Sequence, residues 1–335
     1  MTMIVRAAGL DDLPALDAMA RSTGGGFVNL PPDRDKLRDR LTAAIAAFGR
    51  EQGQPDDDRF LFVLEDGADA CGTCQIFARV GGSTPFYSYR IDRRSAWCAG
   101  LDRAIESDEL TICTDHHGCS EVGGLFLRAD ARAAGAGALL ARSRYLFIAM
   151  HRARFADTTI AELRGVVDED GGAPFWDGIA ARFFGIGFAQ ADAFNAANGT
   201  HALAEMMPRT PVLLAMLDPR ARDVVGVPHP SGRPAMRLLE KEGFRHDRYI
   251  DLFDGGPTVT AATDDIATIR AARTATVRAT TATGGTPVIV ASGRLAAFRC
   301  CFGTVAPHGD GIAIDPVAAA ALGAAIGDTL TYAPR

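Results

Sequence analysis

Three features are absent from the sequence, and each absence excludes a class of protein. No stretch of the 335 residues approaches the roughly 18 consecutive apolar residues that a membrane span needs. The chain reaches Asp11 and Asp12 before an apolar segment as long as that of a signal peptide could form. A basic excess is also missing, because the formal net charge is −6, which argues against nucleic acid or an anionic membrane as partner. We therefore expect a cytoplasmic protein that acts on small molecules.

Disulfide bonds and a metal centre are not expected either. The seven cysteines are an odd number in a chain without a secretion signal, so we predict reduced thiols. Cys71 and Cys74 form a C-x-x-C pair, but no second pair and no nearby histidine completes a zinc site. The alternating pattern around them favours buried strand residues, and the same interpretation holds for Cys300 and Cys301.

What is present is the composition of an ordinary globular chain, with 47% hydrophobic and 23% charged residues. At roughly 100 to 200 residues per domain, the length predicts about two structural units. The segments "FLFVLED" and "CGTCQIFARV" predict a hairpin, whereas residues 174–188 and 233–244 each predict a helix that ends at glycine. The recurrence of this helix-then-glycine unit suggests a second half-repeat. We predict an α/β (α+β) fold with a small β-rich C-terminal module over residues 282–335.

Residues 125–147 carry the most informative local pattern, in which a strand ends at Leu127 and a glycine-bearing turn leads into a helix. The first N–H groups of a helix have no intrahelical partner, so such a turn can wrap a phosphate or pyrophosphate. A phosphate loop is excluded because the G-K-S/T ending is missing, and a dinucleotide fingerprint would need a small residue where Leu140 stands. The spacing of Arg132, Gly135 and Gly137 instead resembles the pyrophosphate turn of the GNAT superfamily of acyl-CoA N-acyltransferases.

Longer motifs make the resemblance more specific. They are "DHHGCSEVGGLFL", "ARSRYLFIA", "IAELRGVVDEDGGAPFWDGIAARFF", "HPSGRPAMRLLEKEGF" and "YIDLFDGGP", in this order along the chain. With them the sequence resembles the arginine N-succinyltransferase family over nearly its whole length. The resemblance implies a GNAT-like mixed central sheet flanked by helices. It also implies succinyl transfer from succinyl-CoA to the α-amino group of L-arginine, which gives N2-succinyl-L-arginine and CoA, with L-ornithine as a second acceptor.

The same resemblance implies an organisation and a set of site residues. Residues 1–190 would form the acyl-CoA-binding core, and residues 191–260 a second acyltransferase-like segment that carries the catalytic histidine loop. The catalytic proton donor would be His229. Succinyl-CoA would be a co-substrate, and no cofactor or metal would be permanently bound. The predicted CoA-binding residues are Leu125 and Leu127, through main-chain groups of a bulged strand, and Arg132, Gly135 and Gly137.

The chemistry of the reaction can be compared with the groups available. An amine attacks a thioester only when neutral, and the CoA thiolate must receive a proton, so the site needs a base, an acid, or one group that does both. His229 suits both tasks and lies between Pro228 and Pro230, which hold the backbone extended. Glu121, near the central strand, is an alternative base that would act directly or through water.

Recognition of an arginine substrate requires carboxylates for its guanidinium and a cation for its carboxylate. The neighbouring His116 and His117 do not predict a metal site, because adjacent side chains on extended backbone point to opposite faces. The candidate carboxylates are Glu162, Asp168, Glu169 and Asp177, and the candidate cations for the acceptor are Arg90 and Arg164. The terminal carboxylate of a succinyl group needs a cation too, and the candidates for that role are Arg90, Arg164 and Arg233.

Two alternatives remain at the level of the sequence. One is a related enzyme that uses another acyl-CoA or another amino acid, and the other is a catalytically silent CoA-binding subunit that partners an active paralogue. His117, Gly123 and Gly124 depart from the pattern expected for the family, which bears on acceptor preference and efficiency. A homo-oligomer or an assembly with a paralogous subunit is compatible with either alternative.

Overall fold

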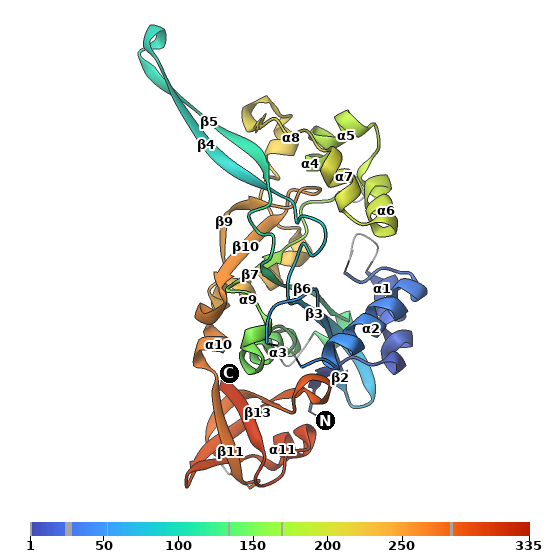
Figure 1. Ribbon diagram of the computed structural model, residues 1–335, viewed down its shortest axis with the longest axis vertical. Helices are drawn as coiled ribbons and strands as arrows, with labels where there is room; N and C mark the ends of the chain where they lie inside the picture. Colours follow the sequence, from blue (N-terminus) through green and yellow to red (C-terminus); the bar gives the residue numbers. More distant parts are fainter. Residues whose placement is uncertain (1, 24–28, 52, 133–134, 169, 282–283) are drawn as a thin grey trace. The chain divides into compact units, whose positions relative to one another are not determined.

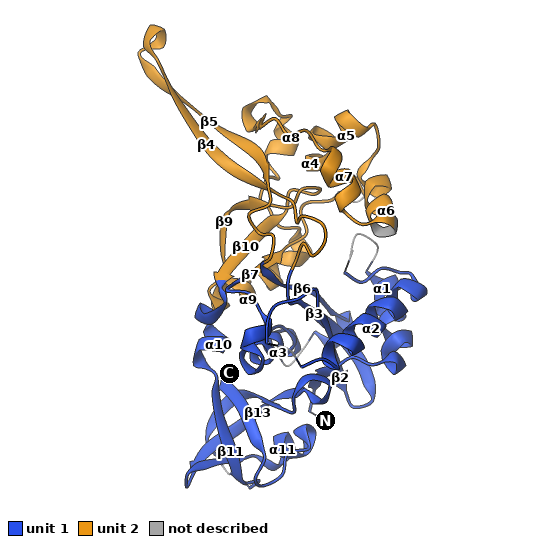
Figure 2. Ribbon diagram, in the orientation of Figure 1, with its two compact units in different colours: residues 1–79, 119–159, 262–335 blue, residues 80–118, 160–261 orange. Residues whose placement is uncertain are grey.

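A computed structural model describes residues 2–23, 29–51, 53–132, 135–168, 170–281 and 284–335. Contacts between residues divide the chain into two compact units that interleave in sequence (Figure 2). Unit 1 comprises residues 1–79, 119–159 and 262–335, and unit 2 comprises residues 80–118 and 160–261. The consecutive segments 1–190, 191–260 and 282–335 of the sequence analysis are a different division, and they stay a prediction about where each function lies.

Unit 1 is built on a mostly antiparallel sheet. A continuous apolar run produces its central strand β2, and five consecutive residues of β2 and six of β3 are buried, which is typical of strands covered on both faces. β11 and β14 form a parallel pair within it. In spatial order the strands are β12 (Thr286–Ser292), β15 (Thr329–Pro334), β11 (Arg273–Ala279), β14 (Gly311–Ile314), β13 (Arg299–His308), β1 (Ile4–Ala7), β2 (Arg59–Asp66), β3 (Asp69–Phe77) and β6 (Ser120–Leu127).

The helices of unit 1 pack on this sheet around a cluster of phenylalanine rings. The Phe147 ring of α3 meets the ring of Phe62 at 5.1 Å and that of Phe298 at 5.2 Å, both edge to face. Asp33 caps α2 by accepting the backbone N–H groups of Asp35 and Lys36. The helices are α1 (Leu13–Ser22), α2 (Arg34–Phe48), α3 (Ala136–Met150), α10 (Ala267–Ala271) and α11 (Pro316–Leu322).

Unit 2 contains a smaller sheet and a group of short helices (Figure 1). Its core surrounds the buried Trp176, whose indole N–H donates to the carbonyl of Ile186 at 2.9 Å. The strands, in spatial order, are β7 (Thr158–Glu162), β10 (Pro257–Ala262), β9 (Arg245–Ile250), β4 (Ser88–Cys98), β5 (Arg103–Cys113) and β8 (Val212–Leu213). The helices are α4 (Pro174–Gly178), α5 (Ala180–Phe184), α6 (Phe188–Asn198), α7 (His201–Met206), α8 (Pro219–Arg222) and α9 (Arg233–Glu242).

The mixed α and β fold predicted from the sequence is confirmed, with one correction to its helices. The single helix expected over residues 174–188 is interrupted at Ile179, which has non-helical dihedral angles, and at Gly185, which is left-handed. Close packing accompanies the first break, because a Cβ at Gly178 would lie 2.3 Å from the Cβ of Ala221 in α8. The helix predicted over residues 233–244 is present as α9 and ends at the left-handed Gly243. Within the described ranges, no helix combines the length and apolarity that crossing a membrane requires.

Candidate active site

The strand that precedes the glycine turn is bulged, as the sequence analysis expected. Between the pairs Gln75–Gly123 and Thr73–Phe126, two residues of β6 lie opposite one residue of β3. One of the two is Gly124, whose φ of +58° lies in the left-handed region that favours glycine. The bulge interrupts the ladder next to Leu125, where the sequence predicts main-chain hydrogen bonds to pantetheine.

The glycine turn itself opens α3 through a left-handed residue. Gly135 has a φ of +82° and accepts the N–H of Leu139 at 3.0 Å, while Gly137 has helical backbone and open space where a Cβ would stand. The Nε–H of Arg132 donates to the carbonyl of Leu127, at the end of β6, at 3.2 Å. The first N–H groups of α3 have no intrahelical partner, and a cation shortly before them in the sequence favours an anion at this helix start.

A second cation reaches this turn from the C-terminal module. A Cβ at Gly135 would lie 3.3 Å from a terminal nitrogen of Arg335, whose guanidinium stacks over the Phe302 ring at 4.1 Å. Arg142 of α3 holds the preceding residue, because it donates to the carbonyl of Pro334 at 2.8 Å. Sequence reasoning missed Arg335, since nothing in the local pattern of β15 signals where its end lies.

A cavity of about 540 Å³ lies beside the connection from β6 to α3. Phe126 and Arg132 line it from that connection, and Met19 lines it from α1. Arg128, also on its wall, is held by the carboxylates of Asp69 at 2.7 Å and Asp130 at 3.0 Å. Of the predicted CoA-binding residues, Arg132 borders this concave space of ligand size within unit 1.

Glu121 lies on β6, opposite Phe77 of β3, and its side chain is buried. Burial lowers the pKa of the nearby Arg59, and the negative charge of Glu121 opposes that shift. Glu121 therefore interacts with a buried guanidinium, and its role as an alternative base stays a prediction.

His229 belongs to unit 2 and lies on a loop fixed at several points. Its backbone N–H donates to the carbonyl of Arg164 at 2.8 Å, and it caps the short turn Pro230–Gly232 that leads into α9. The backbone N–H of Ser231 donates to Nδ1 at 3.2 Å, and the Ser231 hydroxyl lies 2.7 Å from the same nitrogen. Nδ1 is therefore an acceptor, and the neutral ring carries its proton on Nε2.

The electrostatic surroundings keep this ring neutral. Burial lowers the pKa of His229, and the positive charge of Arg164 lowers it further. Protonation of Nδ1 would also turn two donors toward each other, because the N–H of Ser231 already points at that atom. At neutral pH the His229 ring consequently offers an Nε2–H donor.

The loop "DLFDGGP", residues 251–257, is hydrogen-bonded to the two segments that hold His229. It is part of a motif that carries the family resemblance, and no role for it follows from the sequence. Asp254 accepts the N–H of Gly165 at 2.8 Å and so fixes the residue after Arg164. The carbonyl of Gly255 accepts the N–H of Gly226, at the start of the histidine loop, at 2.8 Å. A Cβ at Gly256 would lie 2.0 Å from the carbonyl oxygen of Leu163, so only glycine fits there. Burial raises the pKa of Asp254, and the neighbouring Asp251 raises it further.

The candidate cations for a carboxylate differ in whether their guanidinium groups already bind other side chains. Arg90 binds the carboxylates of Asp92 and Asp115, both at 2.8 Å, and Arg233 is exposed at the start of α9. The Nε of Arg164, in contrast, is buried and has no hydrogen-bond partner among the described residues. The carbonyl of Arg164 also accepts the backbone N–H of His229, so Arg164 is the best placed of the three cations.

The candidate carboxylates for the acceptor guanidinium that the structure describes lie on different segments of unit 2. Glu162 at the end of β7 accepts the Thr258 hydroxyl at 3.5 Å, and Asp168 accepts the N–H of Gly172 at 2.6 Å within a tight turn. Asp177 lies on α4, where burial raises the pKa of its carboxyl group and the charge of Asp168 raises it further. Glu169 lies outside the described residues.

Comparison with known proteins identifies the family of this chain. The profile described as arginine N-succinyltransferase beta subunit matches residues 3–268, and the profile of the C-terminal domain of that subunit matches residues 273–334. This chain belongs to the arginine N-succinyltransferase beta subunit family. The resemblance found in the sequence is thereby confirmed.

Individual relatives of the family agree with the match. Arginine N-succinyltransferase subunit beta of Pseudomonas aeruginosa is 41% identical over 268 residues, which are 80% of this chain and 78% of that protein. An arginine N-succinyltransferase of Escherichia coli is 39% identical over 274 residues, 81% and 79% of the two chains. The solved structure of arginine/ornithine succinyltransferase subunit AI from Pseudomonas aeruginosa superposes with a TM-score of 0.88 at 30% identity, covering 99% of this chain and 98% of that one.

The two adjacent histidines of this family member lie in a turn, which corrects the extended segment expected from the sequence. Residues 115–118 form the turn, yet the rings still point to different partners. His116 is buried against the Tyr249 ring at 4.3 Å, and the His117 ring occupies the space beside Gly81. Among the described residues, no three His, Cys, Asp or Glu side chains gather closely enough to hold a metal.

The cysteine prediction is confirmed for the two pairs that it named. Cys71 and Cys74 are buried on β3 and donate to the carbonyls of Leu64 at 3.5 Å and Leu140 at 3.4 Å. Burial raises the pKa of Cys74 to about 12, and that of Cys301 to about 12 as well. Thiols in this state are poor nucleophiles and poor metal ligands.

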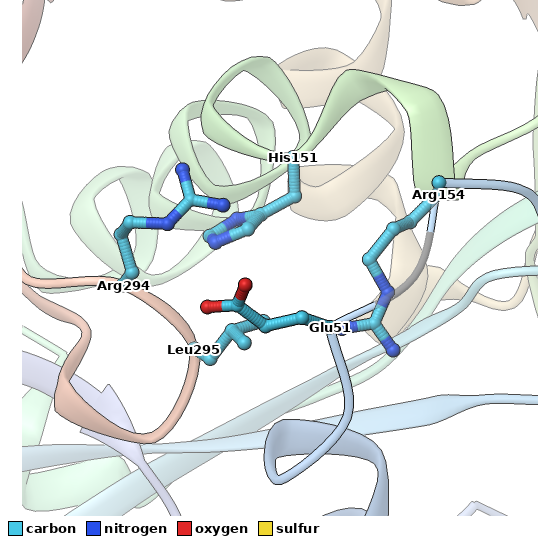
Figure 3. Close-up of a pocket in the computed structure, with 6 residues that line it drawn as sticks. Glu51, His151, Arg154, Arg294 and Leu295 are labelled. Atoms are coloured by element: carbon cyan, nitrogen blue, oxygen red, sulfur yellow. The ribbon is translucent and has the colours of Figure 1, made fainter.

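A further cavity, of about 290 Å³, lies in unit 1 away from the predicted CoA turn. Figure 3 shows the His151 ring between the side chains of Arg294 and Glu51, with Arg154 on the same wall. His151 is 5% exposed, and its Nδ1 donates to the carbonyl of Phe147 at 2.9 Å. Burial lowers the pKa of His151 to about 4, so this cluster matters for the pH dependence of stability.

Proposed function

We propose that this protein transfers the succinyl group of succinyl-CoA to the α-amino group of L-arginine, giving N2-succinyl-L-arginine and CoA. The observation that carries the proposal is the match to the arginine N-succinyltransferase beta subunit family over residues 3–268. The presence of His229 and of Arg132, Gly135 and Gly137 in the sequence supports an active member of that family. L-Ornithine is proposed as a second acceptor, because one similar protein is named arginine/ornithine succinyltransferase.

The glycine turn of unit 1 is proposed to bind the CoA pyrophosphate. The first N–H groups of α3 would donate to its oxygens, and Arg132 would balance part of its charge. The open space at Gly137 allows the phosphate to approach the backbone closely. The bulge at Gly124 and Leu125 supports the proposed contact of β6 with the pantetheine amides.

His229 is proposed to act on the departing sulfur. The neutral α-amino nitrogen attacks the thioester carbonyl, the carbon–sulfur bond breaks, and the proton lost by nitrogen ends on the CoA sulfur. The Nε2–H of the neutral ring can donate a hydrogen bond that stabilises the developing thiolate, and it keeps its proton because its loss would leave an imidazolate, so the proton that reaches the sulfur is the one released by the amine. Hydrogen bonds from Ser231 to Nδ1 hold the ring in the tautomer that this step needs.

Arg164 is proposed to bind the terminal carboxylate of the succinyl group. Burial of an unpaired carboxylate costs several kcal/mol, so a site for succinyl needs a cation or a set of N–H donors. The unpartnered Nε of Arg164 and its position next to His229 support this assignment. A donor without that carboxylate, such as acetyl-CoA, would leave the buried Nε of Arg164 without a hydrogen-bond partner, although the charge of Asp192 interacts with this guanidinium.

An assay of the purified chain alone tests the proposed function. Succinyl-CoA and L-arginine are supplied, thiol release is followed, and the product mass is determined. We expect release of CoA together with a product heavier than arginine by one succinyl group. Thiol release that never exceeds the hydrolysis blank would instead identify a silent subunit, and the proposal would then be abandoned.

A further inference from the structure

The longest hairpin of unit 2 extends beyond the rest of that unit (Figure 1). β4 and β5 pair over eleven positions, from Ser88–Cys113 to Cys98–Arg103. Only the base of the hairpin is attached to other strands, since β4 pairs with β9 at Tyr89 and Arg90, and β5 pairs with β8 at Glu109 and Leu110. We call residues 93–108, beyond these attachments, the arm.

Most side chains of the arm are exposed to solvent in the single chain. Residues 94–97 and 103–106 are exposed, so both faces of the ribbon contact solvent among the described residues. An isolated two-stranded hairpin is marginally stable in water, and its open backbone edges invite another chain. A hairpin of this length is expected to be covered by something in the functional assembly.

The end of the arm presents apolar side chains to solvent. Trp97 is 66% exposed, Leu101 56% and Ile105 47%. Exposed aromatic residues of this kind are typical anchors of protein interfaces, where a large side chain fills a complementary space. Trp97 is one of two tryptophans in the chain, and the other, Trp176, is fully buried.

One face of the arm is complementary to itself. In an antiparallel pair, directly opposite residues share a face, and every second residue along a strand does too. The face that carries Trp97 therefore carries Arg93 on β4, and Ala104, Glu106 and Asp108 on β5. Its β4 side carries a cation and a large ring, and its β5 side carries the exposed carboxylate of Glu106, which pairs with Arg93 of the same arm, together with the half-buried carboxylate of Asp108 and a small residue.

We propose that two copies of this chain associate through the Trp97 face of the arm. If two arms stack about a two-fold axis that runs along them, β4 of one copy lies over β5 of the other. Arg93 then faces a carboxylate of the second copy, and Trp97 faces Ala104, and the same contacts recur on the other side. An arginine-rich or an acid-rich partner would leave one strand unmatched, whereas a second copy matches both. The proposal does not depend on the catalytic assignment.

The oligomeric state of the full chain tests the proposal, by sedimentation equilibrium over nanomolar to high micromolar concentrations. We expect a dimer in the wild type and a rise of the dissociation constant by about tenfold to a hundredfold in Trp97→Ala, as for an interface anchor. Dissociation on dilution should also shift the tryptophan emission to the red, and Trp97→Phe should abolish that shift. A wild-type chain that stays monomeric at every concentration overturns the proposal, as does a dimer that Trp97→Ala leaves unchanged.

Charge reversal distinguishes the Trp97 face from the opposite face. Arg93→Glu makes the face acidic on both strands, and Glu106→Arg with Asp108→Arg makes it basic on both, so each variant alone should be monomeric. Mixed together they should associate, although neither regains the ion pair that joins Arg93 and Glu106 within one arm. Arg94→Glu, on the opposite face with a 68% exposed side chain, is the matched control and should remain dimeric. Failure of the mixture to associate, or dissociation of the control, would count against the Trp97 face.

Discussion

The substitution Gly137→Ala separates ligand binding from folding at the glycine turn. Gly137 is the second residue of α3, its backbone is helical, and an added Cβ would find nothing within 4 Å. Alanine is intrinsically better than glycine within a helix by up to about 1 kcal/mol. The free energy of unfolding should therefore stay at the wild-type value or rise slightly.

The same methyl group should obstruct CoA. It occupies the open space through which the pyrophosphate would approach the first N–H groups of α3. Loss of one hydrogen bond to a charged group is worth about 1.5 to 3 kcal/mol, which corresponds to a roughly tenfold to hundredfold weaker affinity. Isothermal titration calorimetry with CoA measures the affinity, and urea denaturation measures the stability.

Gly135→Ala is the matched comparison. Its φ of +82° is left-handed, so alanine there should cost about 1 to 2 kcal/mol of unfolding free energy. We therefore expect the free energy of unfolding to fall in Gly135→Ala and to stay at the wild-type value or rise in Gly137→Ala. A Gly137→Ala protein with wild-type CoA affinity would refute the assignment of this turn to the pyrophosphate.

Two other predictions follow from the histidines. His229→Ala should lower kcat by about 10² to 10⁴-fold with little change in succinyl-CoA affinity, and a folded variant with near wild-type turnover would move the role to another group. His151 has a pKa of about 4 in the folded protein and near 6.5 when unfolded, so the unfolded chain binds the extra proton and stability is lost as pH falls through that window, by up to roughly 3 kcal/mol. Denaturation at pH 7 and pH 4.5 should show a smaller difference for His151→Asn, which keeps an N–H donor, and an unchanged difference would exclude His151 as the cause.

Local patterns in the sequence were sufficient to predict several parts of the fold and site. The strand-to-helix joint at Leu127 and the end of α9 at Gly243 depend on residues close in sequence, whereas the bulge beside the joint was implied by the family resemblance. The positive φ of Gly135 follows from the same local chemistry. Such features can be predicted because neighbouring residues determine them.

Contacts between distant segments could not be predicted in this way. The break of the helix at Ile179 accompanies packing of α4 on α8, some forty residues later. Support of His229 by Asp254, through Gly165 and Arg164, joins three separate loops. The approach of Arg335 to Gly135 depends on the tertiary position of β15. Each of these follows from the tertiary fold and leaves no periodic signal in the sequence.

The donor preference of the enzyme tests the central claim most directly. Steady-state rates of CoA release with L-arginine as acceptor give kcat/KM for succinyl-CoA and for acetyl-CoA. A site that pairs a buried cation with the succinyl carboxylate should favour succinyl-CoA by a large factor, because acetyl-CoA leaves that cation unmatched. Arg164→Gln should reduce the preference chiefly by lowering kcat/KM for succinyl-CoA. Equal kcat/KM for the two donors in the wild-type enzyme would contradict the assignment of succinyl-CoA as the substrate.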